Sequence, residues 1–364
     1  MKNRINISRP SAPPVEEFTA EIADIWDSRM FTNVGKKHAR LEQELCEYLG
    51  TQNVSLFSSG HSALEAALQI LNLKGEVITT PFTFASTPLA IIRNRLTPVF
   101  CDINENNYCM NADLIENLIT DKTCAIVPVH LFGNICDVDK IEEISRKYNI
   151  PVVYDAAQAF GIKKKGKYIS DYGDISMYSF HATKVFHTIE GGCLVYKNNE
   201  LKKVFSEIRN FGICDEKIIR IGANFKMSEI HAAMGLCNLH RLNEYINNRK
   251  ICAKRYDELL SGRKGLYFNQ LQDNVKTNYV YYPLRVVENE YGQSRDKLFE
   301  KLARNNINAR KYYPLVSQFA IYNDRYNLSE TPVASYIEKQ LIILPLYSDM
   351  AIENVEEVCK VILH

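Results

Sequence analysis

Two spacings of hydrophobic residues alternate along the first two thirds of the chain. Short β-branched runs bounded by turn residues predict strands at 54–57, 76–79, 124–127 and 152–154. In the stretches before and between them, apolar residues recur at helical spacing, which predicts helices at 15–26, 64–71, 114–118 and 138–144. Apolar strands separated by helices are typical of a mostly parallel sheet covered on both faces. The pattern therefore predicts an α/β fold.

The pattern changes in the last third of the chain. Ser228 is a suitable N-cap for a long helix whose apolar residues continue to Ile246. Beyond about residue 255, the spacing predicts a strand, a helix, a strand and a final helix at 279–286, 298–302, 341–344 and 355–362. We interpret residues 1–245 as a large domain with an N-terminal helical segment, and residues 246–364 as a smaller α+β domain.

Composition narrows the class of protein. The chain has 364 residues, of which 46% are hydrophobic, enough for a substantial core. Its 44 basic and 43 acidic residues leave a net charge of +1, which weighs against binding to nucleic acid or an anionic membrane. The ten cysteines lack Cys-x-x-Cys spacing, which predicts reduced core residues and no metal site. The first residues lack the apolar run of a secretion signal, which favours a cytoplasmic protein.

Two residues suggest the chemistry. Asp155 ends an apolar predicted strand, and Lys184 follows a second strand, 29 residues (184 − 155) further on. In open α/β sheets, ligands bind beyond the carboxyl ends of the strands. An acid there can keep a pyridine nitrogen protonated and an amine can condense with an aldehyde, as pyridoxal phosphate (PLP) chemistry requires. Gln158 could donate a hydrogen bond to the phenolic oxygen of the same ring. The structural alternatives are a capping aspartate and a solvated lysine.

Three further segments bear on this proposal. Residues 58–62 precede the helix predicted from residue 63, where backbone N–H groups either bind a phosphate or are simply capped. Phe82 and Phe84 follow the strand at 76–79 and either stack on a planar ring or belong to the core. The lysine run at 163–167 predicts a solvated hairpin turn around Gly166. No Gly-x-Gly-x-x-Gly turn follows the first strand, which weighs against a dinucleotide-binding oxidoreductase.

Several motifs in the same order carry a family resemblance that covers nearly the whole chain. They lie at residues 59–60, 81–84, 128–133, 155–161, 179–184, 190–192 and 222–229. Together they resemble the DegT/StrS family of nucleotide-sugar aminotransferases. The resemblance implies a fold-type I PLP-dependent aminotransferase, with a mostly parallel sheet covered by helices plus the smaller C-terminal domain. It also implies a homodimer with active sites at the subunit interface.

The resemblance also assigns roles to residues. Lys184 is expected to be the Schiff-base lysine, Asp155 the partner of the pyridine nitrogen, Gln158 the contact to the ring hydroxyl and Phe84 the stacking aromatic. The expected phosphate contacts are Gly60, His61, Ser62, Ser179 and, from the other subunit, Asn224.

One position departs from the family pattern, which usually has Thr where this chain has His61. The expected hydroxyl contact to phosphate is then lost unless Ser62 replaces it. His181, His187 and Tyr313 are candidates for sugar or pyrophosphate contacts, with a structural role as the alternative for each.

The resemblance extends to the reaction. Relatives with His at position 184 dehydrate their substrates, so Lys184 implies transamination. The strings at 179–184 and 188–192 are similar to those of enzymes that make dTDP-4-amino-4,6-dideoxyglucose from dTDP-4-keto-6-deoxyglucose for surface polysaccharide (O-antigen) biosynthesis. We expect L-glutamate as the donor and a nucleotide-linked keto sugar as the acceptor. A 3-keto sugar aminotransferase and a slow PLP-binding regulatory protein remain alternatives, and the nucleotide and sugar stereochemistry stay open.

Overall fold

The computed structural model describes residues 4–312, 314–322 and 326–364. Its central sheet runs in the order β3-β2-β4-β5-β8-β9-β1, with the bridges Ile126–Val152 and Val129–Asp155 joining β4 to β5. Neighbouring strands are parallel except at β9, which is antiparallel to both β8 and β1. The mostly parallel sheet that we predicted is thus confirmed. The strands are β1 (Val54–Phe57), β2 (Glu76–Thr79), β3 (Thr97–Phe100), β4 (Thr123–Ile126), β5 (Val153–Asp155), β8 (Ile175–Ser179) and β9 (Gly192–Tyr196).

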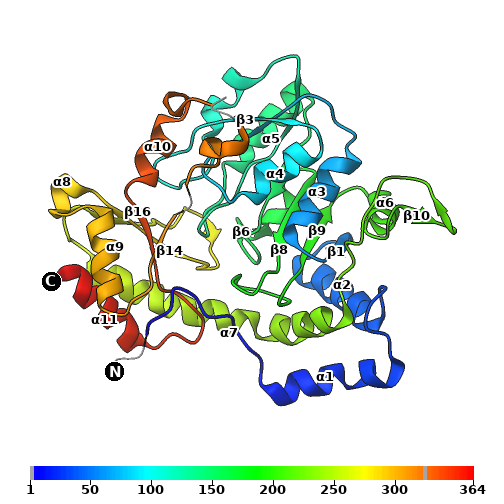
Figure 1. Ribbon diagram of the computed structural model, residues 1–364, viewed down its shortest axis with the longest axis horizontal. Coiled ribbons are helices and arrows are strands. Elements are labelled where there is room, and N and C mark those ends of the chain that lie inside the picture. Colours follow the sequence, from blue (N-terminus) through cyan, green and yellow to red (C-terminus); the bar gives the residue numbers. More distant parts are fainter. Residues whose placement is uncertain (1–3, 313, 323–325) are drawn as a thin grey trace.

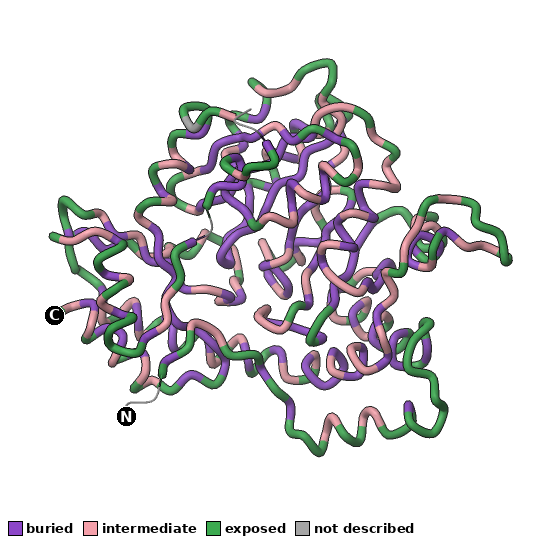
Figure 2. The backbone as a smooth tube through the Cα atoms, in the orientation of Figure 1, coloured by how far each residue is buried: buried purple, intermediate pink, exposed green. Residues whose placement is uncertain are grey.

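Helices cover both faces of this sheet (Figure 1). Alternate residues of a strand point to opposite faces, so Val77 packs with one set of helices and Ile78 with the other. One face carries α3 (Gly60–Ile70), α4 (Ser86–Arg93) and α6 (Leu201–Ile208). The other carries α2 (Lys36–Leu49), α5 (Val138–Tyr148) and the first part of α7 (Glu229–Leu260). Burial on both faces explains why these strands are mostly apolar, and Figure 2 shows most of their residues in purple, as buried.

A second, antiparallel sheet forms the C-terminal part of the molecule, and we call it the small sheet. Its order is β12 (Leu266–Phe268), β14 (Tyr282–Val286), β16 (Leu341–Leu344) and β15 (Arg310–Lys311). The end of α7, α9 (Arg295–Arg304) and α11 (Ile352–Leu363) share its hydrophobic core. The short helices α8 (Glu288–Tyr291) and α10 (Pro332–Glu338) complete this part. Helix α7 passes through residue 245 without a break, so a domain division there remains a proposal.

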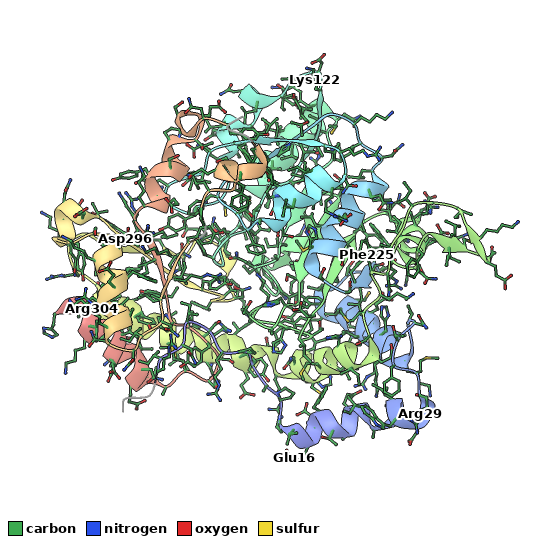
Figure 3. The ribbon with its side chains drawn as sticks, viewed as in Figure 1. Glu16, Arg29, Lys122, Phe225, Asp296 and Arg304 are labelled. Carbon is green, nitrogen blue, oxygen red and sulfur yellow. The ribbon has the colours of Figure 1, made fainter. Side chains whose placement is uncertain are left out.

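The N-terminal segment lies along the small sheet, although the sequence pattern placed it with the large domain. Ile5 forms a bridge with Ile307, and the backbone N–H of Leu346 donates to the carbonyl of Ile7 at 3.2 Å. The chain then forms α1 (Val15–Ser28), which packs against α7. Figure 3 marks Glu16 and Arg29 near the two ends of α1, far from Asp296 and Arg304 on α9.

Local differences from the predicted elements have simple causes. The helix expected from residue 63 begins at Gly60 because Ser59 is its N-cap. Residues 112–118 form two 3-10 turns instead of an α-helix. The strand expected from residue 279 begins at Tyr282, since Tyr279 has a φ of 52°. These bounds depend on capping and backbone angle, which hydrophobic spacing does not report.

Short hairpins complete the chain. The predicted turn around Gly166 is confirmed, with β6 (Lys163–Lys164) and β7 (Lys167–Tyr168) on either side and a φ of 82° at the glycine. Strand β13 (Val275–Lys276) pairs with β6. A hairpin that the sequence did not predict, β10 (Ile213–Cys214) and β11 (Lys217–Ile218), projects from the body of the molecule (Figure 1). In the described part of the chain, no helix is long and apolar enough to span a membrane.

Candidate active site

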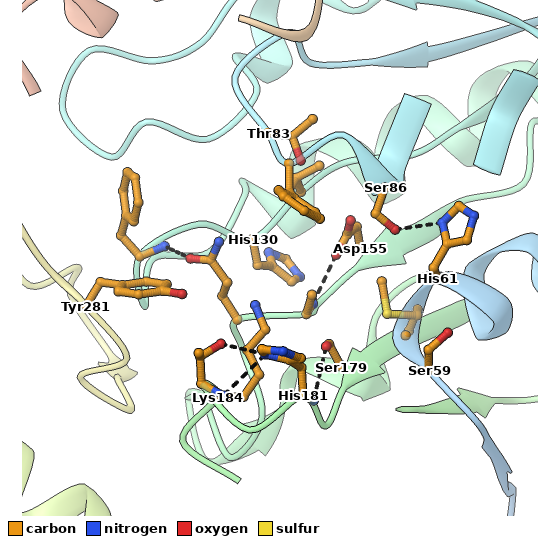
Figure 4. A pocket seen from close by; sticks show the side chains of 18 of the residues that line it. Ser59, His61, Thr83, Ser86, His130, Asp155, Ser179, His181, Lys184 and Tyr281 are labelled. Carbon is orange, nitrogen blue, oxygen red and sulfur yellow. Dashed lines mark hydrogen bonds between the residues drawn. The ribbon is translucent and has the colours of Figure 1, made fainter. Parts of the chain in front are cut away.

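A cavity of about 410 Å³ lies where the strands of the central sheet end. Asp155 is the last residue of β5 and Ser179 the last of β8, while Phe84 follows β2 and Gly60 follows β1. Because parallel strands present their carboxyl ends at one edge of a sheet, these residues meet although they are distant in sequence. Figure 4 shows side chains from all these segments around one space.

Asp155 and Lys184 line this same cavity, as the sequence predicted. Asp155 is buried, and its carboxylate accepts hydrogen bonds from the Thr87 hydroxyl at 2.7 Å and the Ala157 N–H at 3.0 Å. Burial raises the pKa of Asp155, while these hydrogen bonds and the positive charge of Lys184 oppose the rise. A fixed, buried carboxylate of this kind suits contact with a cationic ring nitrogen.

Lys184 lies in the loop that follows β8. Its backbone N–H donates to the carbonyl of His181 at 2.9 Å, which closes a tight turn and orients the lysine. The side chain is half-buried and points into the cavity (Figure 4). The amine is therefore within the electrostatic range of Asp155 while leaving space between them for a ligand.

The N-terminus of α3 forms a cradle for a phosphate. Gly60 and His61 line the cavity, and their N–H groups precede the first intrahelical hydrogen bond, from Ala63 to Ser59. A Cβ on Gly60 would lie 2.9 Å from the Cβ of Ser179, so only glycine lets the helix approach the end of β8 this closely. The hydroxyl of Ser179 also lines the cavity. Of the four phosphate contacts expected from this subunit, Gly60, His61 and Ser179 line the cavity and Ser62 does not.

Ser62 has its hydroxyl engaged elsewhere. It accepts from the Ser59 N–H at 3.1 Å and donates to the Ser59 carbonyl at 2.9 Å, completing a capping box. It is buried and does not line the cavity. The geometry thus gives no support to Ser62 as a replacement hydroxyl for phosphate. His61 lines the cavity instead, with Nδ1 2.9 Å from the hydroxyl of Ser86, a cavity residue that the sequence did not single out.

Gln158 and Phe84 are both in the cavity lining. The Phe132 N–H donates to Oε1 of Gln158 at 2.8 Å, and this fixes which end of the amide remains available. The NH₂ group is then the donor that can serve a ligand, as the predicted contact to a ring hydroxyl requires. Phe84 is 52% exposed, so its ring has a face that a planar ligand can cover.

The two candidate histidines for substrate contact differ. His181 lines the cavity, with Nδ1 2.9 Å from the Thr183 hydroxyl and Nε2 3.6 Å from the Glu190 carboxylate. His187 is buried away from it. Its Nε2 donates to the Ser11 carbonyl at 2.7 Å, and its Nδ1 accepts from the Ile189 N–H at 3.2 Å. Because backbone groups take both ring nitrogens, the expectation of a sugar contact at His187 is corrected to a structural role.

Asn224 does not line the cavity of this chain. Asn224 is exposed and forms a bridge with Asn210. Its exposure fits the expectation that it reaches the other subunit, which stays a prediction. Tyr313 lies outside the described residues.

The cavity also has a group of residues that the sequence did not predict. We call them the small-sheet residues, because they belong to the small sheet or lie along it; they are Ile7, Ser8, Tyr281, Arg310, Tyr312 and Ile343. Only the neighbouring Tyr313 had been a candidate. No local pattern marks the others, since the sequence does not reveal that the N-terminal segment and the small sheet meet the central sheet here.

An acid and a lysine in one cavity, beside a helix N-terminus that can hold a phosphate, fit the class of PLP-dependent enzymes. Comparison with known proteins agrees. Residues 14–363 match the DegT/DnrJ/EryC1/StrS aminotransferase family, and the chain belongs to this family.

Individual relatives are similar over their whole length. The chain is 39% identical to a dTDP-4-amino-4,6-dideoxy-D-glucose transaminase from Shigella dysenteriae, covering 100% of this chain and 99% of the relative. The structure of DesI in the presence of its TDP-sugar product superposes with a TM-score of 0.94 at 26% identity, over 99% and 92% of the two chains. A Streptococcus pneumoniae protein described as a sugar aminotransferase, in its PLP form, gives a TM-score of 0.91 at 28% identity, over 99% and 98%.

Proposed function

We propose that this enzyme transfers an amino group from L-glutamate to the C4 keto group of dTDP-4-keto-6-deoxy-D-glucose, giving dTDP-4-amino-4,6-dideoxy-D-glucose. The observation that carries the transamination is the single cavity shared by Asp155 and Lys184. The choice of sugar is supported by the full-length similarity to the Shigella transaminase of that name. Surface polysaccharide (O-antigen) biosynthesis is the proposed use of the product.

The residues divide the work between holding the cofactor and moving a proton. Bound PLP supplies an electron sink for breaking the carbon–hydrogen bond of an amino acid. Asp155 keeps the ring nitrogen protonated, while Gly60, His61 and Ser179 hold the phosphate at the start of α3. Lys184 would hold the cofactor through its amine. The same amine, when free, would take a proton from the donor's α-carbon and would deliver a proton to the sugar carbon that receives the nitrogen.

The small-sheet residues suit a sugar nucleotide. The hydroxyls of Tyr281 and Tyr312 can meet sugar oxygens, and the guanidinium of Arg310 can meet an anionic group. His181, also in the lining, is the remaining histidine candidate for substrate contact. These groups line the same cavity as Lys184, and their proposed role is to hold the keto carbon near its amine.

We also propose that the enzyme is a homodimer in which Asn224 of each subunit completes the phosphate contacts of the other. The exposure of Asn224 supports this assignment. A cytoplasmic location is supported by the ten cysteines, all of which are free.

The test is to incubate the PLP-loaded protein with glutamate and, separately, with 3-keto and 4-keto dTDP-6-deoxyhexoses, and to locate the new nitrogen by NMR. We expect amination at C4 of the 4-keto sugar alone. Amination only at C3 would overturn the sugar assignment. A purified protein that stays colourless after incubation with PLP would overturn the enzyme class.

A further inference from the structure

His130 is a cavity residue to which neither the family motif nor the proposed function assigns a role. It follows β4, and its backbone N–H donates to the carbonyl of Asp155 at 3.0 Å. The side chain is fully buried from solvent, and its ring stacks on Tyr154 with centroids 4.7 Å apart and an interplanar angle of 12°. Figure 4 shows His130, Asp155 and Lys184 around the same space. The ring is therefore held rigidly beside the cofactor residues.

The hydrogen bonds of His130 fix its tautomer. The Cys136 N–H donates to Nδ1 at 3.1 Å, so Nδ1 carries no proton. Burial lowers the pKa of His130 to about 3, so the ring is neutral near pH 7 and its proton is on Nε2. Nε2 has no hydrogen-bond partner in the part of the chain that the structure describes. A buried N–H donor without an acceptor, on a residue that lines the cavity, indicates an acceptor on the ligand.

The geometry around Asp155 identifies which ligand atom this acceptor is. In PLP, the ring oxygen and the phosphate arm lie on opposite sides of the axis through the ring nitrogen. With the nitrogen at Asp155 and the phosphate at α3, the oxygen lies on the side away from α3. Two donors of the cavity that lie outside α3 are the side chains of His130 and Gln158, and the amide of Gln158 is oriented by Phe132.

We propose that Nε2–H of His130 donates a hydrogen bond to the ring oxygen of PLP, jointly with the amide of Gln158. This inference rests on the proposed function only in requiring that PLP binds. An oxygen anion has lone pairs for both donors, and two donors stabilise its negative charge. They also draw electron density away from the nitrogen that joins Lys184 to the cofactor, so this nitrogen loses its proton at a lower pH.

The other titratable groups around His130 keep one charge state near neutral pH. Burial raises the pKa of Tyr154 beneath the ring and of Cys136 beside it, so both remain neutral. Asp155 and the cofactor-bound Lys184 are present equally in wild type and variants of His130. A shift in the titration of the cofactor on changing His130 therefore reports the missing hydrogen bond.

Two matched variants separate this role from a structural one. In His130→Asn, the side-chain oxygen can take the place of Nδ1 and accept from Cys136, but nothing reaches the position of Nε2. In His130→Gln, the amide nitrogen can reach that position, but the acceptor for Cys136 is lost. The measurement is the pH midpoint of the visible absorption band of the PLP-loaded, full-length protein without substrates, with the melting temperature of each protein beside it.

We expect His130→Asn to raise the pH midpoint by about one unit, the size of one hydrogen bond to a charged oxygen. His130→Gln should keep a midpoint near that of wild type and melt at a lower temperature. An unchanged pH midpoint in His130→Asn would overturn the inference. So would equal shifts of the pH midpoint in both variants, if the shifts scale with the loss of melting temperature. A wild-type protein without a visible band would overturn the proposed function itself.

Wild-type protein provides a second measurement if His130→Asn does not fold. With ¹⁵N-labelled histidine, the resonance of Nε2–H in His130 should move to lower field when the apo protein is loaded with PLP. It should not move in this way with the 3-deoxy analogue of PLP, which lacks the ring oxygen. The same resonance position with both cofactors would contradict the proposed hydrogen bond.

Discussion

The residues at the strand ends of the central sheet and the small-sheet residues line one cavity but are held in different ways. Asp155, Gln158 and His130 each accept at least one backbone N–H and are buried. Tyr281 and Arg310 reach the cavity from a separate sheet, and Arg310 is exposed. The first group has one rigid geometry, which suits a cofactor that all members of the class share. The second includes the exposed Arg310, which suits a part of the site that varies with the sugar.

We call the residues at the strand ends of the central sheet the strand-end group. Within this group, replacing Lys184 should have the largest effect. Lys184→Ala removes both the amine that attaches the cofactor and the group that carries the proton, so turnover should fall by at least about 10²–10⁴-fold. Lys184 is half-buried, and its hydrogen bond to the His181 carbonyl is made by the backbone N–H, which the substitution keeps. The melting temperature of the apo protein should therefore change little. Steady-state turnover and calorimetry check both points. Retained turnover would refute the role of the lysine.

Asp155→Asn should have the next largest effect, because it removes the charge that keeps the ring nitrogen protonated. We expect a loss of about 10²–10³-fold in turnover, as for other preorganised charges in enclosed sites. Asp155 is buried, and its carboxylate accepts two hydrogen bonds. The asparagine side chain has nearly the same shape, so the variant should keep much of the packing around it.

The apo protein gives an independent readout for Asp155. Burial raises the folded-state pKa of Asp155 above the ordinary value of 3.8, so the folded protein holds this proton more tightly than the unfolded chain does. The contribution of Asp155 to the free energy of unfolding is therefore present below 3.8 and is lost as pH rises through the folded-state pKa. Urea unfolding across this range should show the decline in wild type and not in Asp155→Asn. Identical pH profiles would contradict the burial effect.

Arg310→Gln tests the small-sheet residues. Losing a charge-assisted hydrogen bond should lower kcat/KM for the substrate by about 10–100-fold. The visible band of the bound cofactor and its pH midpoint should match those of wild type. Arg310→Lys serves as the control that retains the charge. A change in the cofactor spectrum would show that the two groups are not independent.

His187→Phe should have the smallest effect on turnover, because His187 lies outside the cavity. It removes the donor to Ser11 and the acceptor for Ile189, which should cost about 1–3 kcal/mol of stability. Burial lowers the folded-state pKa of His187, so its contribution to stability is present above 6.5 and is lost as pH falls. The difference in unfolding free energy between wild type and variant should therefore shrink below this pH. A large rise in KM with unchanged stability would restore the sugar-contact hypothesis.

By itself, the sequence determined the strand-end group. Asp155, Gln158 and Lys184 follow apolar strands, and strands of one parallel sheet end at one edge, so local patterns sufficed to bring these residues together. The same reasoning gave the mostly parallel sheet and the capped start of α7 at Ser228.

Only the tertiary structure decided the rest. Ser62 closes a cap and His187 holds the N-terminal segment through Ser11, while the Nε2–H of His130 has no partner among the described residues. The small sheet and the N-terminal segment supply residues to the cavity from the two ends of the chain. A buried polar side chain takes its role from the hydrogen-bond partners that surround it in the folded protein. Here those partners come from segments distant in sequence, and the spacing of hydrophobic residues does not predict that these segments meet.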